Sequence, residues 1–257
     1  MGAEFSDATE GSRTLCWFSC GATSAVATKL MVQGRQAWPV VIAYTEVEEE
    51  HEDNERFLKD CESWFGQDIV ILRNEKYRAS IYEVFRRERY LVGPFGAPCT
   101  KHLKRNMRES FMRPGDVHVL GFSAEEKNRA EAFEENNPAL DCRFPLIERG
   151  LTKNDCLALV NDAGIQLPEM YRLGYEHNNC IGCVKGKMGY WNKIRVDFPE
   201  TFARMAATER ELGATINRKD GNPVYLDELD PNAGRGQKEP SIECGVFCEQ
   251  VKLELQP

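Results

Sequence analysis

The sequence of 257 residues predicts an α/β protein with a Rossmann-like parallel sheet flanked by helices. Short apolar runs alternate with segments of helical spacing, and only short turns separate them. Runs in this order form βαβ units, in which the strands are parallel and the helices cover the sheet. Continuous apolar strands also indicate a sheet that is buried on both faces.

The predicted elements follow the chain in the order that βαβ units require. The first strand covers residues 14–19, and a tight turn at Cys20 and Gly21 leads into a helix of small residues at 22–30. Apolar runs predict further strands at 40–44, 68–72 and 116–121. Further helices are predicted at 53–65, 81–91, 99–111, 123–133, 152–160 and 188–212, and Thr152 with Asp155 caps the fifth of these.

Composition divides the chain into three parts. Residues 1–13 are predicted to form a flexible N-terminal tail, and residues 14–170 a nucleotide-binding domain. Residues 171–257 are predicted to be a helical, cysteine-rich, metal-binding appendage that includes a polar stretch at 213–240. In an open parallel sheet, ligands bind at the carboxyl ends of the strands. We therefore expect the turn after residue 19 and the segments after Tyr44 and Gly121 to line one crevice.

Charge and cysteine content limit the partners and the compartment. Lys and Arg number 33 against 41 Asp and Glu, so the formal charge is −8 and a nucleic acid would need a local basic patch. No apolar stretch is long enough to span a bilayer, and no secretory signal is present, which predicts a cytoplasmic protein with no membrane partner. Ten cysteines in such a chain favour metal or redox use of some of them.

Small residues at 19–24 form the first candidate site. At a junction from strand to helix they expose backbone N–H groups at the helix N-terminus, where phosphate binds well. The alternative is that these residues are small for steric reasons only. The predicted contacts are Ser19, Cys20, Gly21, Ala22, Thr23 and Ser24.

The pair Cys180 and Cys183 forms the second candidate site. Two cysteines of a CxxC turn can hold one face of a metal, and Cys99, Cys244 or Cys248 can complete four thiolates around zinc or an iron–sulfur cluster. The alternative is free buried thiols. That interpretation is the preferred one for four cysteines at apolar positions, namely Cys16, Cys61, Cys142 and Cys156.

Two charged segments allow both a functional and a solvated interpretation. The basic segment beside Cys99 can favour its thiolate and bind phosphate or sulfate, or it can be a solvated helix face. Its cations are Lys101, His102, Lys104, Arg105 and Arg108. The acidic run at 46–53 is predicted to be a solvated loop that brings one or two carboxylates near a ribose or a metal. His51 and His177 are predicted to be ordinary polar residues.

The order of these motifs resembles the phosphoadenosine-phosphosulfate reductase family of the adenine nucleotide α-hydrolase (PP-loop ATP pyrophosphatase) superfamily. FSCGATSAV at 18–26 looks like the family's modified PP-loop. GFSAEEKNRAEAF at 121–133 looks like the family's loop that follows a strand, and this loop carries an acidic residue and an Arg, here Arg129. PCTKHLKRNM at 98–107, the segment 144–175 with its Gly-Tyr before the CxxC, and IECG at 242–245 are similar to the remaining family motifs.

The resemblance implies an enzyme that binds an adenine nucleotide, either ATP or a phosphosulfate, at residues 19–24, Tyr44, Gly121 and Arg129. It implies a four-iron four-sulfur cluster or zinc on Cys99, Cys180, Cys183 and Cys244 or Cys248. It also implies a reductase in which Lys101, Lys104 and Arg105 hold sulfate, Cys244 attacks sulfur, and a thioredoxin-like reductant resolves the product.

Three positions differ from the family pattern and keep other functions open. Pro98 stands where a further cysteine ligand lies, Thr23 where ATP pyrophosphatases carry Asp, and Phe247 where reductases carry His. One alternative is an ATP-dependent sulfurtransferase that thiolates a nucleic acid (tRNA or DNA). The other is a non-catalytic nucleotide-binding module with structural zinc.

Overall fold

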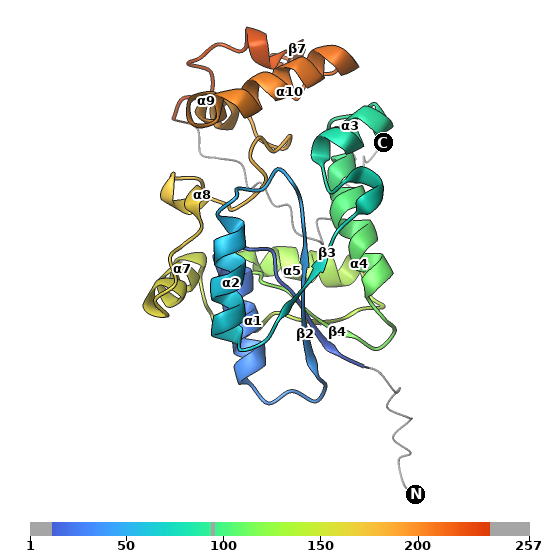
Figure 1. Ribbon diagram of the computed structural model, residues 1–257, viewed down its shortest axis with the longest axis vertical. Coiled ribbons are helices and arrows are strands. Elements are labelled where there is room, and N and C mark those ends of the chain that lie inside the picture. The colour runs from blue at the N-terminus through green and yellow to red at the C-terminus, as the bar shows by residue number, and fades with distance from the viewer. Residues whose placement is uncertain (1–11, 94–95, 237–257) are drawn as a thin grey trace, which may run out of the picture.

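The computed structural model describes residues 12–93 and 96–236 of the chain, and these form a parallel sheet flanked by helices (Figure 1). Five parallel strands lie in the order β3-β2-β1-β4-β5. Their bounds are β1 (Thr14–Trp17), β2 (Val40–Thr45), β3 (Ile69–Leu72), β4 (Val117–Val119) and β5 (Asp141–Arg143). The predicted α/β class and parallel sheet are therefore confirmed.

Helices cover both faces of the sheet because successive strand residues point to opposite sides. Cys16 and Ile42 belong to a buried cluster with α1 (Ala22–Gln33), α2 (Asn54–Phe65) and α7 (Lys153–Asp162). Leu15 and Ala43, their chain neighbours, belong to a second cluster with α4 (Asn106–Phe111) and α5 (Lys127–Asn136). Two short helices come after β5 in the chain, α6 (Pro145–Glu148) and α8 (Glu169–Arg172).

The remaining elements gather at one end of the molecule, uppermost in Figure 1. One buried cluster joins Val84 of α3 (Ile81–Glu88) and Leu103 to Trp191 of α9 (Met188–Asp197) and Met205 of α10 (Pro199–Leu212). The C-terminal segment therefore shares a core with residues from the middle of the chain. An antiparallel hairpin of β6 (Asn217–Lys219) and β7 (Asn222–Val224) lies here, and the buried Glu209 accepts the N–H groups of Ile216 and Leu226.

Two predicted elements differ from the structure. The single helix predicted at 188–212 is two helices, because Pro199 disfavours helical backbone at Phe198 and starts α10 as its first residue. The helix predicted at 99–111 begins as a π-helix, η2 (Thr100–Arg105), whose last turn closes with the N–H of Asn106 on the Lys101 carbonyl. Strand β5 was not predicted, since its residues Asp-Cys-Arg carry no apolar run.

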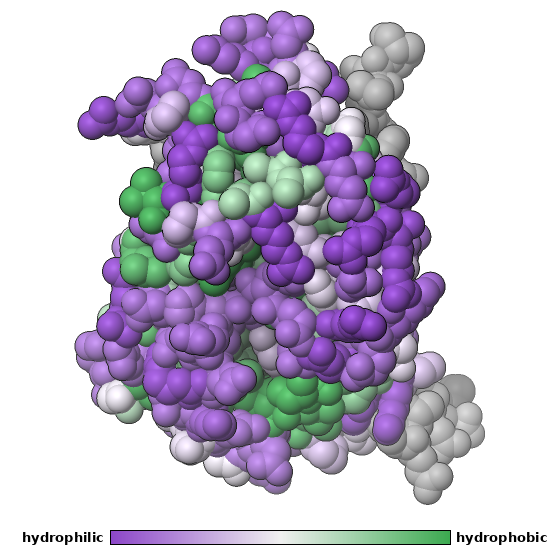
Figure 2. All heavy atoms as spheres, turned by 45° about the horizontal axis from the view of Figure 1, so that its top comes forward, coloured by the Kyte–Doolittle hydropathy of each residue, from purple (hydrophilic) through white to green (hydrophobic). Residues whose placement is uncertain are grey.

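The start of the described chain is anchored to the sheet. Arg13 is buried and donates through Nε (3.0 Å) and Nη2 (2.6 Å) to the carboxylate of Asp116. Arg13, which the sequence assigned to the tail, thus belongs to the folded part. No helix within the described ranges is long and apolar enough to cross a membrane, and the face in Figure 2 is mostly hydrophilic with scattered hydrophobic patches.

Candidate functional site

The turn between β1 and α1 lies at the carboxyl edge of the sheet and is held by Ser24. Its Oγ donates to the Gly21 carbonyl (3.0 Å) and accepts from the N–H (3.0 Å) and the Oγ (3.1 Å) of Ser19. Ser24 is buried, whereas Ser19 is exposed. Of the two predicted serine contacts, only Ser19 therefore presents its side chain to solvent, and Ser24 shapes the turn.

Backbone geometry around the turn brings Gly121 against it. A Cβ on Gly121 would lie 2.7 Å from Ser24 Cα and 2.8 Å from Ser24 N, so only glycine allows this approach. Cys20 adopts the left-handed region with φ of 57°, which is uncommon for a residue other than glycine. A strained residue at a strand-to-helix junction is frequent at functional sites.

The hydroxyl of Tyr171 closes part of the helix N-terminus. It accepts the backbone N–H groups of Ala22 and Asn178, and desolvation raises the pKa of Tyr171 to about 12, so the phenol stays protonated. Of the predicted small residues, Ala22 is thus covered, while Thr23 is half-exposed at the start of α1. The turn is therefore open to solvent on the side of Ser19 and Thr23.

Asn178, two residues before the CxxC pair, joins the cysteine segment to the turn. Its Nδ2 donates to the Cys20 carbonyl (2.6 Å) and to Asn54 Oδ1 (2.8 Å), and all three residues are buried. Its Oδ1 is buried and has no donor among the described residues. The segment that leads to Cys180 therefore lies directly on the predicted nucleotide turn.

A buried acid forms the centre of the neighbouring network. Glu50 Oε2 accepts from Tyr44 Oη (2.5 Å) and Asn54 Nδ2 (2.9 Å), and Oε1 lies 3.5 Å from Lys104 Nζ. Burial, and then Glu50, raise the pKa of Tyr44 far above its ordinary value, so the phenol is a donor. Tyr44, predicted to contact nucleotide, is buried and directs its hydroxyl to Glu50.

The prediction of a solvated loop at 46–53 is wrong for two of its acids. The side chain of Glu50 is only 4% exposed. Glu49 accepts from Ser80 Oγ (2.5 Å) and from the N–H of Ile81 (2.9 Å), and burial raises its pKa. Specific donors compensate both carboxylates for the water that they lose, and charge patterning along the chain does not reveal those donors.

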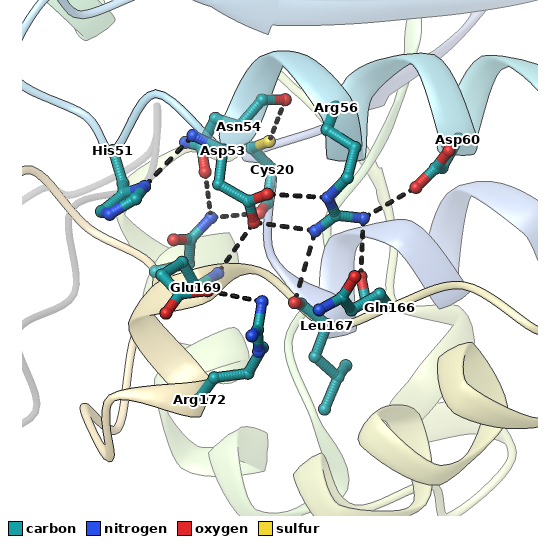
Figure 3. A network of polar contacts seen from close by, with 11 residues as sticks. Cys20, His51, Asp53, Asn54, Arg56, Asp60, Gln166, Leu167, Glu169 and Arg172 are labelled. Carbon is teal, nitrogen blue, oxygen red and sulfur yellow. Dashed lines mark hydrogen bonds and ion pairs between the residues drawn. The ribbon is translucent and has the colours of Figure 1, made fainter.

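Figure 3 shows how Arg56 ties the C-terminal connection to α2. Its guanidinium binds both carboxylate oxygens of Asp53 (2.7 Å each) and Asp60 Oδ2 (2.7 Å). It also donates to the carbonyls of Gln166 (3.0 Å) and Leu167 (3.4 Å). Arg56 thereby positions Gln166 and Leu167, from which the chain continues through α8 to the CxxC pair.

The cysteines of the predicted metal site lie in one apolar cluster. Cys99, Cys180 and Cys183 are buried there, and Tyr190 Oη accepts the N–H groups of Gly182 (3.1 Å) and Cys183 (3.0 Å). Across the described ranges, no three His, Cys, Asp or Glu side chains form a group that could hold a metal ion. The predicted set also includes Cys244 and Cys248, which lie outside the described residues.

The four cysteines predicted to be plain thiols behave accordingly. Cys16, Cys61 and Cys156 are buried, Cys142 is half-buried, and none of the four forms a disulfide. Burial raises the pKa of each thiol, to about 12 for Cys16, so none is a thiolate at neutral pH.

The predicted cations of the basic segment do not share one site. Lys104 is buried against Glu50, whereas Lys101 is exposed and lines a surface pocket with Arg105. Arg129, at the carboxyl edge of the sheet, pairs with Glu126 (2.6 Å) and lies over the Phe122 ring.

Sequence reasoning missed Asn178, Tyr171 and Arg56. Their partners are distant in the chain, and no local pattern marks an amide, a phenol or a guanidinium as a bridge. Compared with known proteins, the chain matches no family model and no curated protein.

Proposed function

We propose that the protein is an adenine nucleotide-binding enzyme of the phosphoadenosine-phosphosulfate reductase type that carries out thiol-dependent sulfur chemistry. The observation that carries the proposal is the contact between Asn178 and Cys20, because it sets the CxxC segment on the turn at residues 19–24. A nucleotide at that turn and a thiol from the C-terminal segment would then meet at one edge of the sheet. The reaction class, attack of a thiol on the sulfur of a phosphosulfate, is the one that the resemblance to the reductase family implies.

The turn offers a place for the nucleotide phosphates. Helix α1 begins there without acidic residues in its first turn, and backbone N–H groups at a helix N-terminus stabilise anions. Arg129 adds a guanidinium at the same edge. Asn178 Oδ1, a buried acceptor without a donor in the described chain, would accept an N–H or O–H of the ligand.

The thiol chemistry falls to Cys244 in this proposal. Its thiolate would attack the sulfur of an adenosine phosphosulfate, AMP would leave, and a thioredoxin-like thiol would release sulfite from the S-sulfonated cysteine. Cys99, Cys180 and Cys183 have the residue type of thiolate ligands for an iron–sulfur cluster or zinc and share one buried cluster, but no three of the described side chains form a group that could hold a metal ion, so no step of the proposal passes through such a group.

A second candidate is an ATP-dependent sulfurtransferase that acts on a nucleic acid. The separation of Lys101 and Arg105 from Lys104 favours it, because the cations predicted to hold one sulfate face two different sites. In this case ATP would adenylate an oxygen of the acceptor and release pyrophosphate, the outer sulfur of a cysteine persulfide would displace AMP, and a second thiol would free the thiolated product by forming a disulfide with that cysteine.

Product analysis separates the candidates. We expect binding of ATP or adenosine phosphosulfate, with sulfite release for the reductase and nucleic acid-dependent pyrophosphate release for the sulfurtransferase. Cys244→Ser should abolish turnover, whereas Cys142→Ser, a half-buried thiol on β5, should not. Nucleotide binding without either product would indicate a binding module, and absence of nucleotide binding would refute the proposal.

A further inference from the structure

A basic pocket lies outside the site described above. It has a volume of about 250 Å³ and lies between the end of α3 and the π-helix η2. Six of its lining side chains carry the argument, namely Glu88, Tyr90, Lys101, His102, Arg105 and Lys185. None of the residues of the β1–α1 turn lines it, so it is a separate site.

Positive charge prevails in this pocket although the protein as a whole is acidic. Lys101, Arg105 and Lys185 bring three cations, and Glu88 is the one carboxylate among the lining residues. Glu88 accepts from Tyr77 Oη (2.8 Å) and lies 3.2 Å from His102 Nε2. Burial lowers the pKa of His102, so the imidazole is neutral at pH 7 and the lining keeps a surplus of two positive charges.

The guanidinium of Arg105 lacks an acceptor for one of its donors. Its Nε is buried and makes no hydrogen bond to any described residue. A buried donor without a partner is costly, and a bound anion would satisfy it. Arg also binds phosphate oxygens through two parallel N–H groups.

The π-helix explains why Lys104 is turned away from Lys101 and Arg105, which would share a face in an α-helix as well. A π-helix has more residues per turn than an α-helix, and Lys101 and Arg105 are four residues apart on the pocket side while Lys104 is buried on the other. Lys101 lies two residues after Cys99, and Lys185 lies two residues after Cys183. The pocket therefore adjoins both cysteine segments.

We propose that this pocket binds a phosphate group of the substrate, either of a nucleic acid strand or of a nucleotide. The inference rests on the proposed function, in which the acceptor of sulfur is open. The ammonium of Lys101 and the unpaired Nε–H of Arg105 match a phosphate, and the 39%-exposed Tyr90 beside them offers a ring on which a base can stack.

The test compares Lys101→Gln/Arg105→Gln with a matched control, Lys59→Gln/Arg35→Gln. The control removes the same charges from exposed positions on α2 and after α1, across the molecule from α4 in Figure 1. The probes are a labelled single-stranded oligonucleotide and ATP. A charge-keeping variant that retains Arg105, Lys101→Arg, with unchanged thermal unfolding should bind both probes like the wild type.

The outcomes assign the source of the phosphate. For a nucleic acid strand, the double variant should bind the oligonucleotide roughly tenfold more weakly, and the magnitude of the slope of log K against log salt should fall by about 0.7, the value for one phosphate of a single strand. A loss confined to ATP would assign the pocket to the nucleotide. Affinities equal to those of the control for both probes, or a wild type that binds neither, would overturn the proposal.

This design keeps the two proposals distinguishable. The proposed function fails if ATP and adenosine phosphosulfate both fail to bind, and the oligonucleotide arm still reports on the pocket in that case. Conversely, ATP that binds the pocket variant and the wild type equally leaves the turn at residues 19–24 as its site.

Discussion

Removal of Lys104 should expose how strongly the buried ion pair with Glu50 holds the site together. The side chains are 7% and 4% exposed, and Nζ lies 3.5 Å from Oε1. At an effective dielectric constant of about 20, two unit charges at that distance attract by about 5 kcal/mol, from which the cost of desolvating both must be subtracted. The net value of the pair is smaller than the cost of breaking it.

We therefore expect Lys104→Met to lower the free energy of unfolding by about 3 to 5 kcal/mol, because it leaves an uncompensated carboxylate inside the protein. Glu50→Gln keeps acceptors for Tyr44 and Asn54 but loses the charge. The double variant should be more stable than the sum of the single losses predicts, by about 1 to 3 kcal/mol.

Urea unfolding of the wild type, both single variants and the double variant measures this coupling, with equal m-values as the check that one transition is compared. This double-mutant cycle isolates the coupling between Lys104 and Glu50, because a further interaction of Lys104 is lost equally in the single and the double variant. Losses that add to within about 0.5 kcal/mol would refute the reasoning and indicate that the charge of Lys104 serves a different group.

Three further changes test other parts of the site and the core. Gly121→Ala should abolish nucleotide binding and lower stability by about 1 to 3 kcal/mol, since its Cβ would lie 2.7 Å from Ser24 Cα; nucleotide affinity equal to wild type would contradict this. Arg56→Lys should destabilise by about 1 to 2 kcal/mol in urea, because lysine cannot bind both oxygens of Asp53, and an unchanged midpoint would contradict it. Burial lowers the pKa of His118 to about 4, so the unfolded chain takes up a proton near pH 6.5 that the folded state binds only near pH 4. The stability that burial of the neutral imidazole contributes is fully present above pH 6.5 and is lost as the pH falls toward 4, by about 2 kcal/mol between pH 7 and 5. Urea titrations at several pH values should show a flatter dependence for His118→Gln. An equally steep dependence would contradict this prediction.

Fold class was predictable because burial leaves a local signal. Apolar runs predicted β1 to β4, and the alternation of Leu15 and Cys16 between opposite clusters follows from strand geometry. Strand β5 escaped prediction because an edge strand needs little apolar surface. The break at Phe198 was readable from Pro199, yet the composition of 188–212 favoured one helix.

The candidate site was predictable only in outline. The turn at residues 19–24 and the CxxC pair are marked by residue type and spacing. Glu50 was not, because an acid within an acidic run looks solvated until Lys104, 54 residues away, is known to face it. The sequence also did not show that Lys101 and Lys104 face different sites, because that separation depends on the π-helix η2, for which the sequence carries no signal.

Strain at Cys20 and the hydrogen bond from Asn178 should be energetically coupled. A non-glycine residue in the left-handed region costs about 1 to 2 kcal/mol, and the 2.6 Å bond to the Cys20 carbonyl helps to hold that conformation. In the wild type, Asn178→Ala should therefore destabilise the turn and weaken nucleotide binding.

Cys20→Gly removes the strain, so the backbone keeps the same conformation without help from Asn178. In that background, Asn178→Ala should have a smaller effect on nucleotide affinity than in the wild type, measured by calorimetric titration of all four proteins. Equal effects in both backgrounds would show that the amide acts on the ligand directly, through its Oδ1, and not through the turn. Because 158 residues separate the two partners, a smaller effect in the Cys20→Gly background would show that the C-terminal segment acts through the backbone of the turn at residues 19–24.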